Sequence, residues 1–225
     1  MRLLASLAAA SAALAALTLP APAPAGPGSL GEPGSTVALP LRDAVEALPA
    51  AEETRTGYKR TLFRHWTDAD KDSCSTRNEV LLGEAFIAPE QGARCKLTGG
   101  QWYSPYDDVY VAAPGGLDID HMVPLAEAWD SGAGMWSAKE REAYANDLGD
   151  ERALIAVTAR SNRSKADQDP ATWLPPHQAY RCEYLTDWVA VKTRWQLTVD
   201  GAERQALTEG LAGCPNKPVR VTLAR

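Results

Sequence analysis

The pattern of apolar and polar residues predicts two β-strands around the most unusual polar group of the chain. Residues 117–124 read LDIDHMVP, in which apolar residues alternate with aspartates and a proline ends the run. Such alternation is typical of a strand, because successive side chains point to opposite faces. Residues 154–157, LIAV, predict a second strand, and residues 158–165, TARSNRSK, predict a helix directly after it.

Apolar residues at helical spacing predict further helices before and after this segment. A short strand is also expected over Val109–Val111. Two helices are expected over 41–48 and 76–82, and a third from a capping box of Ser137 and Glu140 to about Leu148. A fourth is expected along a stripe formed by Tyr184, Trp188, Val191 and Trp195. A fifth is expected after a cap formed by Asp200 and Glu203.

The first 25 residues have the pattern of a secretory signal peptide. Arg2 precedes an apolar run over 3–19, and the A-x-A sequence at 23–25 matches a cleavage site. A membrane anchor is the alternative, but the run is short and has no flanking charge cluster. We therefore expect a secreted, extracellular protein without membrane association after cleavage. Residues 26–50, rich in Pro, Gly and Ala, are expected to form a disordered linker, and residues 51–225 one α+β domain.

Net charge and cysteine content narrow the possible functions. The formal net charge is −6, which excludes tight nucleic-acid binding through a bulk positive field. It does not exclude a nuclease, because a bound divalent metal brings its own charge to the phosphate. The four cysteines, which allow three pairings, lack C-x-x-C spacing. In an oxidising compartment we expect disulfides, and the sequential pairing Cys74–Cys95 and Cys182–Cys214 closes two local loops.

The central segment offers the groups that phosphodiester cleavage needs. A neutral imidazole can generate an attacking hydroxide, and one divalent metal can stabilise the extra negative charge. We expect His121 as general base, with Asp120 and Asn162 as oxygen ligands of Mg²⁺, or of Mn²⁺ or another hard divalent ion. Asp118 lies on the same nominal strand face as Asp120 and is either a further ligand or a group that orients one. Asp120 and His121 can share a site only where the strand ends or bends.

Basic residues on the predicted helix complete the expected site. Lys165 is one turn from Asn162 on the same face and is expected to reach a phosphate. Arg163, with Arg160 nearby, is expected to supply positive charge at the scissile strand.

These residues resemble those of secreted HNH, or ββα-metal, endonucleases, and in particular the C-terminal domain of GmrSD-type restriction enzymes. The resemblance covers residues 58–214. It rests on four motifs, Cys74-x-Thr76-Arg77-Asn78-Glu79, Gly99-Gly100-x-Trp102-x-Ser104-Pro105-Tyr106, Asp118-x-Asp120-His121-x-x-Pro124-Leu125 and Asn162-Arg163-Ser164-Lys165-x-Asp167-x-Asp169-Pro170.

The resemblance implies an α+β fold with a ββα-metal core, added helices and short strands, stapled by disulfides. It also implies a monomeric metal-dependent endonuclease, with His121 as base and Asp120 and Asn162 at the metal. The substrate is expected to be nucleic acid, DNA rather than RNA. One departure is the family's middle Asn, which falls near Arg152 or Ala153, where this chain has no Asn. Asn146 is the candidate for pinning the loop instead.

Two other functions stay open from the sequence. In a zinc-dependent hydrolase of cell wall or peptide, His121 would be a metal ligand, but no second histidine lies at ligand spacing. The protein could instead be a degenerate HNH fold that binds a partner, and the missing middle Asn favours this alternative.

Several residues outside the motif core also have two readings. Asp68, Asp70, Asp72 and Glu79 match positions 1, 3, 5 and 12 of an EF-hand loop, but Ser73 replaces the turn glycine, so we expect a structural acidic turn and leave calcium binding open. Arg77 and Glu79 form an ion pair or support the site, and His65 could line the cleft.

Overall fold

The computed structural model describes residues 30–225, so the expected signal peptide lies outside the described residues. The fold is mixed α/β and has two disulfides, in agreement with the expected class at that level. The helices and strands are β1 Thr36–Pro40, α1 Leu41–Ala47, α2 Thr76–Gly83, β2 Glu90–Gln91, β3 Leu97–Thr98, β4 Trp102–Ser104, β5 Val109–Val111, β6 Leu117–His121, α3 Leu125–Asp130, α4 Ala138–Ala145, β7 Leu154–Thr158, α5 Ala159–Lys165, α6 Arg181–Trp195, α7 Gly201–Leu211 and β8 Pro218–Thr222.

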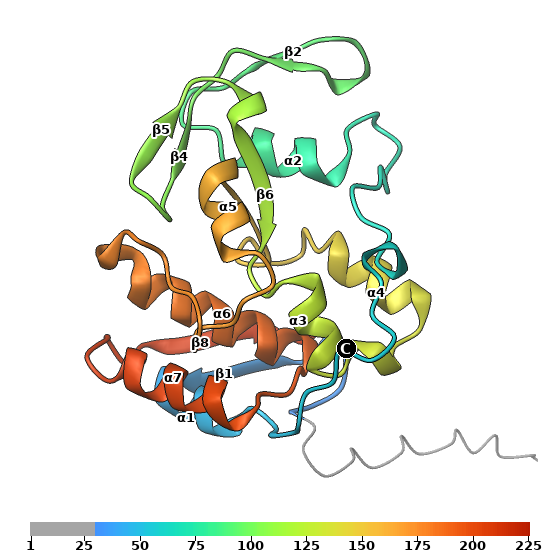
Figure 1. Cartoon of the computed structure of the whole chain (residues 1–225). Helices are drawn as coiled ribbons and strands as arrows, with labels where there is room; N and C mark the ends of the chain where they lie inside the picture. Colours follow the sequence, from blue (N-terminus) through green and yellow to red (C-terminus); the bar gives the residue numbers. More distant parts are fainter. Residues whose placement is uncertain (1–29) are drawn as a thin grey trace, which may run out of the picture.

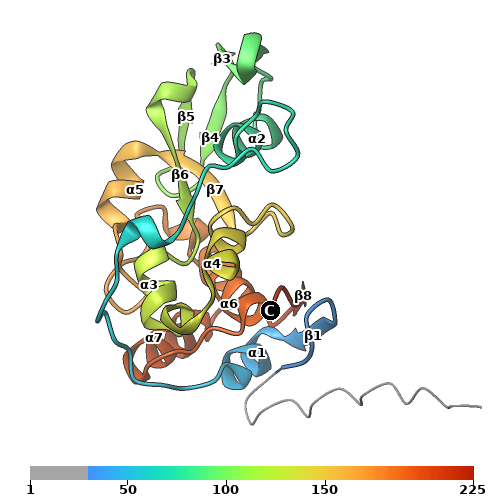
Figure 2. The same ribbon diagram turned by 90° about the vertical axis from the view of Figure 1, so that its right-hand side faces the viewer.

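Strands β6 and β7 form an antiparallel pair whose connection contains α3 and α4. Strand β6 and helix α5 lie in the upper half of the molecule in Figure 1, and Figure 2 shows β7 beside β6. The register pairs Asp118 with Val157, Asp120 with Ile155 and His121 with Leu154. Strand β6 ends at His121, so Asp120 and His121 stand at the end of the strand. This is the position at which neighbouring side chains can turn toward one site, as expected from the sequence.

Helix α6 forms the floor of the core. The aromatic stripe predicted from its sequence is buried, with Tyr184, Trp188 and Trp195 at most 3% exposed. Burying large aromatic side chains contributes a large share of core stability. Helix α7 and the β1–β8 pair pack below α6 in Figure 1, whereas α2, the β4–β5 hairpin and β6 lie above it.

The expected disordered linker over 26–50 is wrong for its second half. Strand β1 pairs with β8 along its whole length, from Thr36 opposite Thr222 to Pro40 opposite Pro218. Helix α1, predicted from its spacing, buries Leu41, Ala44, Val45 and Leu48 in the core. The linker composition hid this, because the partner strand is at the other end of the chain and leaves no local signal. Figure 2 shows β1 and β8 side by side at the base of the molecule.

The predicted caps are present, and one helix is shorter than expected. Ser137 and Glu140 form the capping box of α4, and the Asp200 side chain caps α7 by accepting from the Glu203 amide. Helix α4 ends at Ala145 instead of near Leu148, because Asn146 turns away to bind other segments.

Both expected disulfides form, Cys74–Cys95 and Cys182–Cys214. The first links the start of α2 to the loop before β3, and the second ties α6 to the turn after α7. Within residues 30–225, no helix has the length and apolar character that crossing a membrane requires.

Candidate active site

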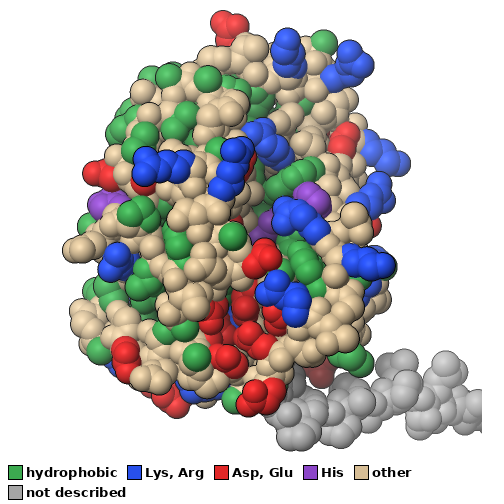
Figure 3. Space-filling model, in the orientation of Figure 1, with side chains coloured by type: hydrophobic (Ala, Val, Ile, Leu, Met, Phe, Trp, Pro, Cys, Tyr) green, Lys and Arg blue, Asp and Glu red, His purple; other side chains and the backbone are tan. Residues whose placement is uncertain are grey.

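A cavity of about 350 Å³ lies where β6 ends, between the start of α3 and helix α5. Its wall contains Asp120, His121 and Asn162 from the expected site, together with Arg163. Arg60, from the short 3-10 turn Arg60–Leu62, completes the basic rim. Figure 3 shows histidine side chains beside Lys and Arg side chains near the middle of this face, above a gathering of acidic side chains.

The His121 ring has a defined tautomer. Its Nε2 lies 3.0 Å from the Ala145 carbonyl oxygen. Because a carbonyl can only accept, Nε2 carries the proton and Nδ1 is left as an acceptor. The ring is stacked on Trp66 at 5.4 Å between centroids, and only 5% of His121 is exposed. Burial lowers the pKa of His121 to about 3, so the imidazole is neutral at pH 7 and Nδ1 keeps its lone pair.

Asn146 fixes the loop that supplies this carbonyl group. Its Oδ1 accepts hydrogen bonds from the Thr67 amide at 3.0 Å and from the Thr76 hydroxyl at 2.9 Å. Its Nδ2 donates to the Arg64 carbonyl at 2.8 Å. A residue next to Ala145 is thereby tied to two other segments of the chain. This geometry agrees with the sequence hypothesis that Asn146 pins the loop in place of the missing middle Asn.

Asp120 is buried, and only one of its two carboxylate oxygens accepts hydrogen bonds from the protein. Its Oδ2 accepts hydrogen bonds from the Tyr106 hydroxyl at 2.6 Å and from the Lys165 ammonium. Within the described residues Oδ1 has no hydrogen-bond donor, although it is not sealed from solvent. Burial raises the pKa of Asp120, and the adjacent Lys165 charge opposes that rise. The free oxygen is at the cavity, where a cation can use it.

Lys165 differs from its expected place at a phosphate. Its side chain is fully buried, and the ammonium donates to Asp120 and to the carbonyl oxygens of His121 and Met122 at 2.9 and 2.8 Å. Asn162 lines the cavity, whereas Lys165 is buried in the core together with Ser161, so the two side chains do not share a face. Lys165 therefore holds the end of β6 in place and has no route to a substrate.

The side chains of Asn162 and Asp118 are hydrogen-bonded to each other, which bears on whether Asp118 is a metal ligand or orients one. The Asn162 amide nitrogen donates to Asp118 Oδ2 at 3.2 Å, which turns the amide oxygen away as a free acceptor. Asp118 is not among the residues that line the cavity, and its hydrogen bond holds the Asn162 amide group. One carboxylate oxygen and one amide oxygen at a polar cavity form a hard donor set that fits Mg²⁺, which keeps several waters.

The basic rim has one member that sequence reasoning missed. Arg163 is 78% exposed, with its guanidinium 3.7 Å from Asp118, and faces the cavity as expected. Arg60 lies far away in sequence and carries no motif, but its charge helps to lower the pKa of His121. Arg160, also expected to help, is exposed but does not line the cavity.

The remaining candidates lie around the site rather than in it. His65 is 6.5 Å from the His121 ring and packs edge-on against Trp66, without lining the cavity. Arg77 donates to the carbonyl oxygens of Pro114 and Leu117, which anchors the start of β6. Among the described residues Arg77 has no salt bridge to Glu79.

Two groups of three carboxylates occur in the described part of the chain, and neither is at this cavity. Asp68, Asp70 and Asp72 are exposed on the loop before α2, where their side chains accept from nearby backbone amides. These bonds fit the structural turn expected from the sequence, and calcium binding there stays untested.

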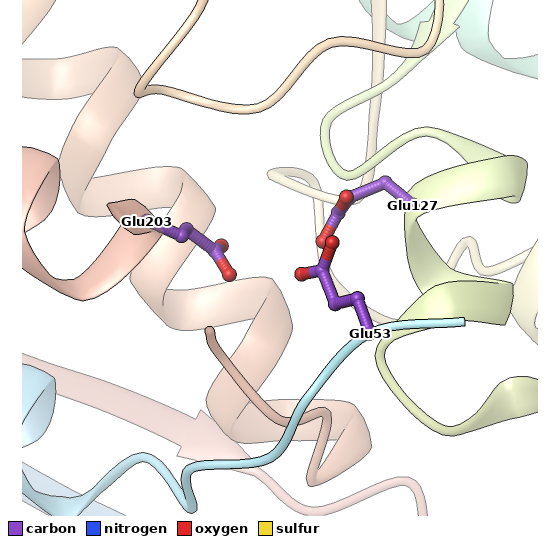
Figure 4. Close-up of side chains that lie close together, drawn as sticks. All are labelled: Glu53, Glu127 and Glu203. Carbon is purple, nitrogen blue, oxygen red and sulfur yellow. The ribbon is translucent and has the colours of Figure 1, made fainter. Parts of the chain in front are cut away.

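The second group is Glu53, Glu127 and Glu203, which converge from three elements (Figure 4). The buried Lys192 ammonium donates to Glu127 and Glu203 at 2.7 Å each. One lysine cannot balance three carboxylates, and Glu53 has a buried oxygen without a partner. Burial and the nearby Glu127 raise the pKa of Glu53 to about 8, so Glu53 carries a proton at pH 7.

Comparison with known proteins identifies the family to which the chain belongs. Residues 55–209 match the C-terminal domain of GmrSD restriction endonucleases. The chain belongs to this family. It is also 40% identical over 182 residues to an uncharacterized secreted protein of Arthroderma benhamiae, a match that spans 81% of this chain and 87% of the other. No solved structure matches significantly.

The GmrSD assignment agrees with the resemblance seen in the motifs. It points to endonuclease activity on nucleic acid, which in restriction endonucleases generally depends on a divalent metal. The matched segment contains β6, β7, α5 and every residue that lines the cavity, so the family match includes the candidate active site.

Proposed function

We propose that this protein is a secreted, metal-dependent endonuclease of the HNH type that hydrolyses phosphodiester bonds, preferably in DNA. The observation that carries the proposal is one cavity lined by the neutral His121 ring, Asp120 and Asn162, in which His121 Nδ1 and one oxygen each of Asp120 and Asn162 have no hydrogen-bond partner among residues 30–225. The β6–β7–α5 arrangement that brings them together is the ββα order expected for this class.

The proposed reaction begins with a water molecule at His121. Nδ1 accepts a proton from this water, and the hydroxide that forms attacks the phosphorus while the P–O bond to the leaving sugar oxygen breaks. The leaving oxygen takes a proton from solvent water, and His121 returns its proton to solvent. The Ala145 carbonyl, already bonded to Nε2–H, stabilises the positive ring that forms, because its hydrogen bond favours the charged imidazole. Trp66 and the loop held by Asn146 keep the ring in this orientation.

Asp120 and Asn162 would hold the divalent metal, most simply Mg²⁺, through Oδ1 of each side chain. When bound, the metal supplies positive charge to the phosphate oxygens and to the leaving oxygen. Asp118 orients the Asn162 amide, and Lys165 with Tyr106 fixes the Asp120 carboxylate. Arg60 and Arg163 attract and position the phosphate backbone, which a chain of net charge −6 cannot do as a whole.

Secretion is the second part of the proposal. Two disulfides fit an oxidising compartment, and the fungal relative is named a secreted protein. Mass spectrometry of protein from culture supernatant should find an N-terminus near Gly26, and an intact Met1 in the mature protein would refute export through this signal.

The test of activity is nicking of a supercoiled plasmid with and without chelator. We expect cleavage with Mg²⁺ or Mn²⁺, its loss with chelator, and weaker metal binding in Asp120→Ala and Asn162→Ala. Asp68→Ala is the matched control, because it removes a carboxylate from the separate acidic turn. Cleavage that persists in chelator would rule out the metal-dependent mechanism. Activity restored only by zinc would favour the zinc-hydrolase alternative, and binding of a partner without any cleavage would favour a degenerate fold.

A further inference from the structure

A second, larger cavity of about 680 Å³ is lined in part by Met122, directly after β6, and by Ile155 of β7. It shares no lining residue with the candidate active site. Its walls come from the segment after α2, the end of β4, strand β7 and the start of α6. The volume is within the range of sites that hold small molecules or single side chains. None of the chemistry proposed above uses this cavity.

The charge of the cavity wall is negative. Four carboxylates line it, from Glu84, Glu151, Glu183 and Asp187. Arg152 also lines it, but its guanidinium is already bound to Asp150 at 2.6 Å and to the Arg220 carbonyl at 2.8 Å. A phosphate or another anion would therefore meet repulsion here, so this cavity is not an extension of a nucleic-acid surface.

Asp187 is the deepest of these carboxylates. It is 8% exposed, and its one hydrogen-bond partner among the described residues is the Tyr180 hydroxyl at a marginal 3.5 Å. Burial together with Glu183 raises the pKa of Asp187 to about 7, and the charge of Arg152, which is already paired with Asp150, opposes that rise only in part. A cation beside Asp187 would oppose that rise further.

Three aromatic side chains, Phe86, Tyr103 and Tyr180, are also part of the wall. Tyr180 is buried against Tyr106 at 5.9 Å between centroids, and the Tyr103 hydroxyl is held by Asp108 at 2.8 Å. Phe86 is 66% exposed at the rim, an unusual position for a phenylalanine in a soluble domain. Ring faces attract ammonium and guanidinium groups, most strongly where water is excluded.

We propose that this cavity binds an organic cation, in which an ammonium or guanidinium group pairs with Asp187 and apolar atoms pack against Tyr103, Tyr180 and Phe86. The ligand is either a small amine or a basic side chain of a polypeptide. Both present the same chemistry to this wall, and the site is independent of the proposed nuclease reaction.

The test uses pairs of probes that differ only in charge. Choline is titrated calorimetrically against 3,3-dimethylbutan-1-ol, its neutral isostere, and an acetylated Gly-Lys-Gly amide against the same peptide with norleucine. We expect the charged member to bind roughly tenfold or more tightly than its neutral partner in at least one pair, as a desolvated cation over aromatic rings predicts. The pair that discriminates identifies the source of the ligand. Equal affinity within both pairs, or no binding of any probe, overturns the proposal.

Two variants locate the binding in this cavity. Asp187→Asn should weaken the cation roughly tenfold or more, whereas Asp43→Asn, the same change on the exposed face of α1, should not. Phe86→Ala is at an exposed position that the fold does not depend on, so it tests the aromatic wall even if Asp187→Asn unfolds. Unchanged binding in Phe86→Ala and Asp187→Asn places the cation elsewhere and overturns the assignment. Plasmid nicking by Phe86→Ala should equal that of the native protein.

Discussion

At the scale of single residues, the site depends on how each polar group is partnered. His121 is useful as a base because one ring nitrogen is committed to the Ala145 carbonyl and the other is free. Asp120 is similar, with one oxygen bound by Tyr106 and Lys165 and the other at the cavity. In both cases a structural hydrogen bond orients the group and leaves one atom for chemistry.

The first prediction concerns His121. We expect His121→Ala to keep the fold and the metal and to lose roughly 10²–10⁴-fold in cleavage rate, the usual contribution of a positioned general base. Added imidazole should restore part of the rate by entering the vacated space. His177→Ala is the matched control, because His177 faces the other cavity. If His121→Ala instead loses its bound metal, His121 is a ligand and the proposed mechanism is wrong.

The second prediction concerns Lys165, which pairs with Asp120 in the interior. Lys165→Met removes one partner of a buried ion pair and leaves the Asp120 charge uncompensated. We expect the free energy of unfolding to fall by about 3–5 kcal/mol, measured by urea denaturation. Arg163→Met, at a largely exposed cation, should leave stability within about 0.5 kcal/mol and reduce cleavage instead. A Lys165→Met protein that keeps its stability but binds substrate more weakly would support the phosphate contact expected from the sequence and contradict the structural role of Lys165.

At the scale of elements, sequence patterns found what is local and missed what is not. The strand pair β6–β7, helix α5, the Ser137 capping box and the aromatic stripe of α6 were predictable because alternation, caps and spacing are written in consecutive residues. Strand β1 was missed because its pairing with β8 joins residues near opposite ends of the described chain. The basic residue Arg60 was missed for the same reason, since only the fold brings its short turn to the cavity.

The burial of Lys165 shows a second limit of sequence reasoning. A helical wheel places Asn162 and Lys165 close together, but it does not show which side of the helix the core covers. Helix α5 is short, and its last turn packs over Tyr106, Tyr184 and Trp188, whose rings lie within 5.8 Å of the Lys165 ammonium. Asn162 and Arg163 therefore line the cavity, whereas Ser161 and Lys165, which are four residues apart, are buried.

The third prediction concerns the Cys182–Cys214 bond, which ties α6 to the turn after α7 across 32 residues. Replacing both cysteines with serine should lower the free energy of unfolding by roughly 3–4 kcal/mol, because the unfolded chain regains the entropy of an open loop. Cleavage should persist at temperatures where the variant is folded, because α7 does not line the active-site cavity. Urea denaturation of the two proteins measures the change. An equal midpoint and slope would mean that this bond adds no stability.

At the scale of the whole molecule, acidic side chains outnumber basic ones, and some of the acidic side chains are buried together in the interior. Glu53 lies on the segment between α1 and the 3-10 turn Arg60–Leu62 and meets Glu127 of α3 and Glu203 of α7 (Figure 4). The group links the N-terminal segment to the helices below the active site. Burial raises the pKa of Glu53 to about 8 and that of Glu203 to about 7, and a proton held within the group lets three carboxyl groups share one Lys192 charge.

The fourth prediction follows from that proton. Burial and Glu127 raise the pKa of Glu53 from 4.5 to about 8 in the folded state. Between these two pH values the folded protein holds a proton that the unfolded chain has released, so stability falls as pH rises through this window. Glu53→Gln keeps a neutral side chain at every pH and should lose part of that decline. Urea denaturation at pH 5, 6.5 and 8 measures it, with Glu209→Gln on the exposed face of α7 as control. Parallel curves for Glu53→Gln and the native protein would show that the proton resides on another carboxyl of the group, whereas a flatter curve for the variant alone would assign it to Glu53.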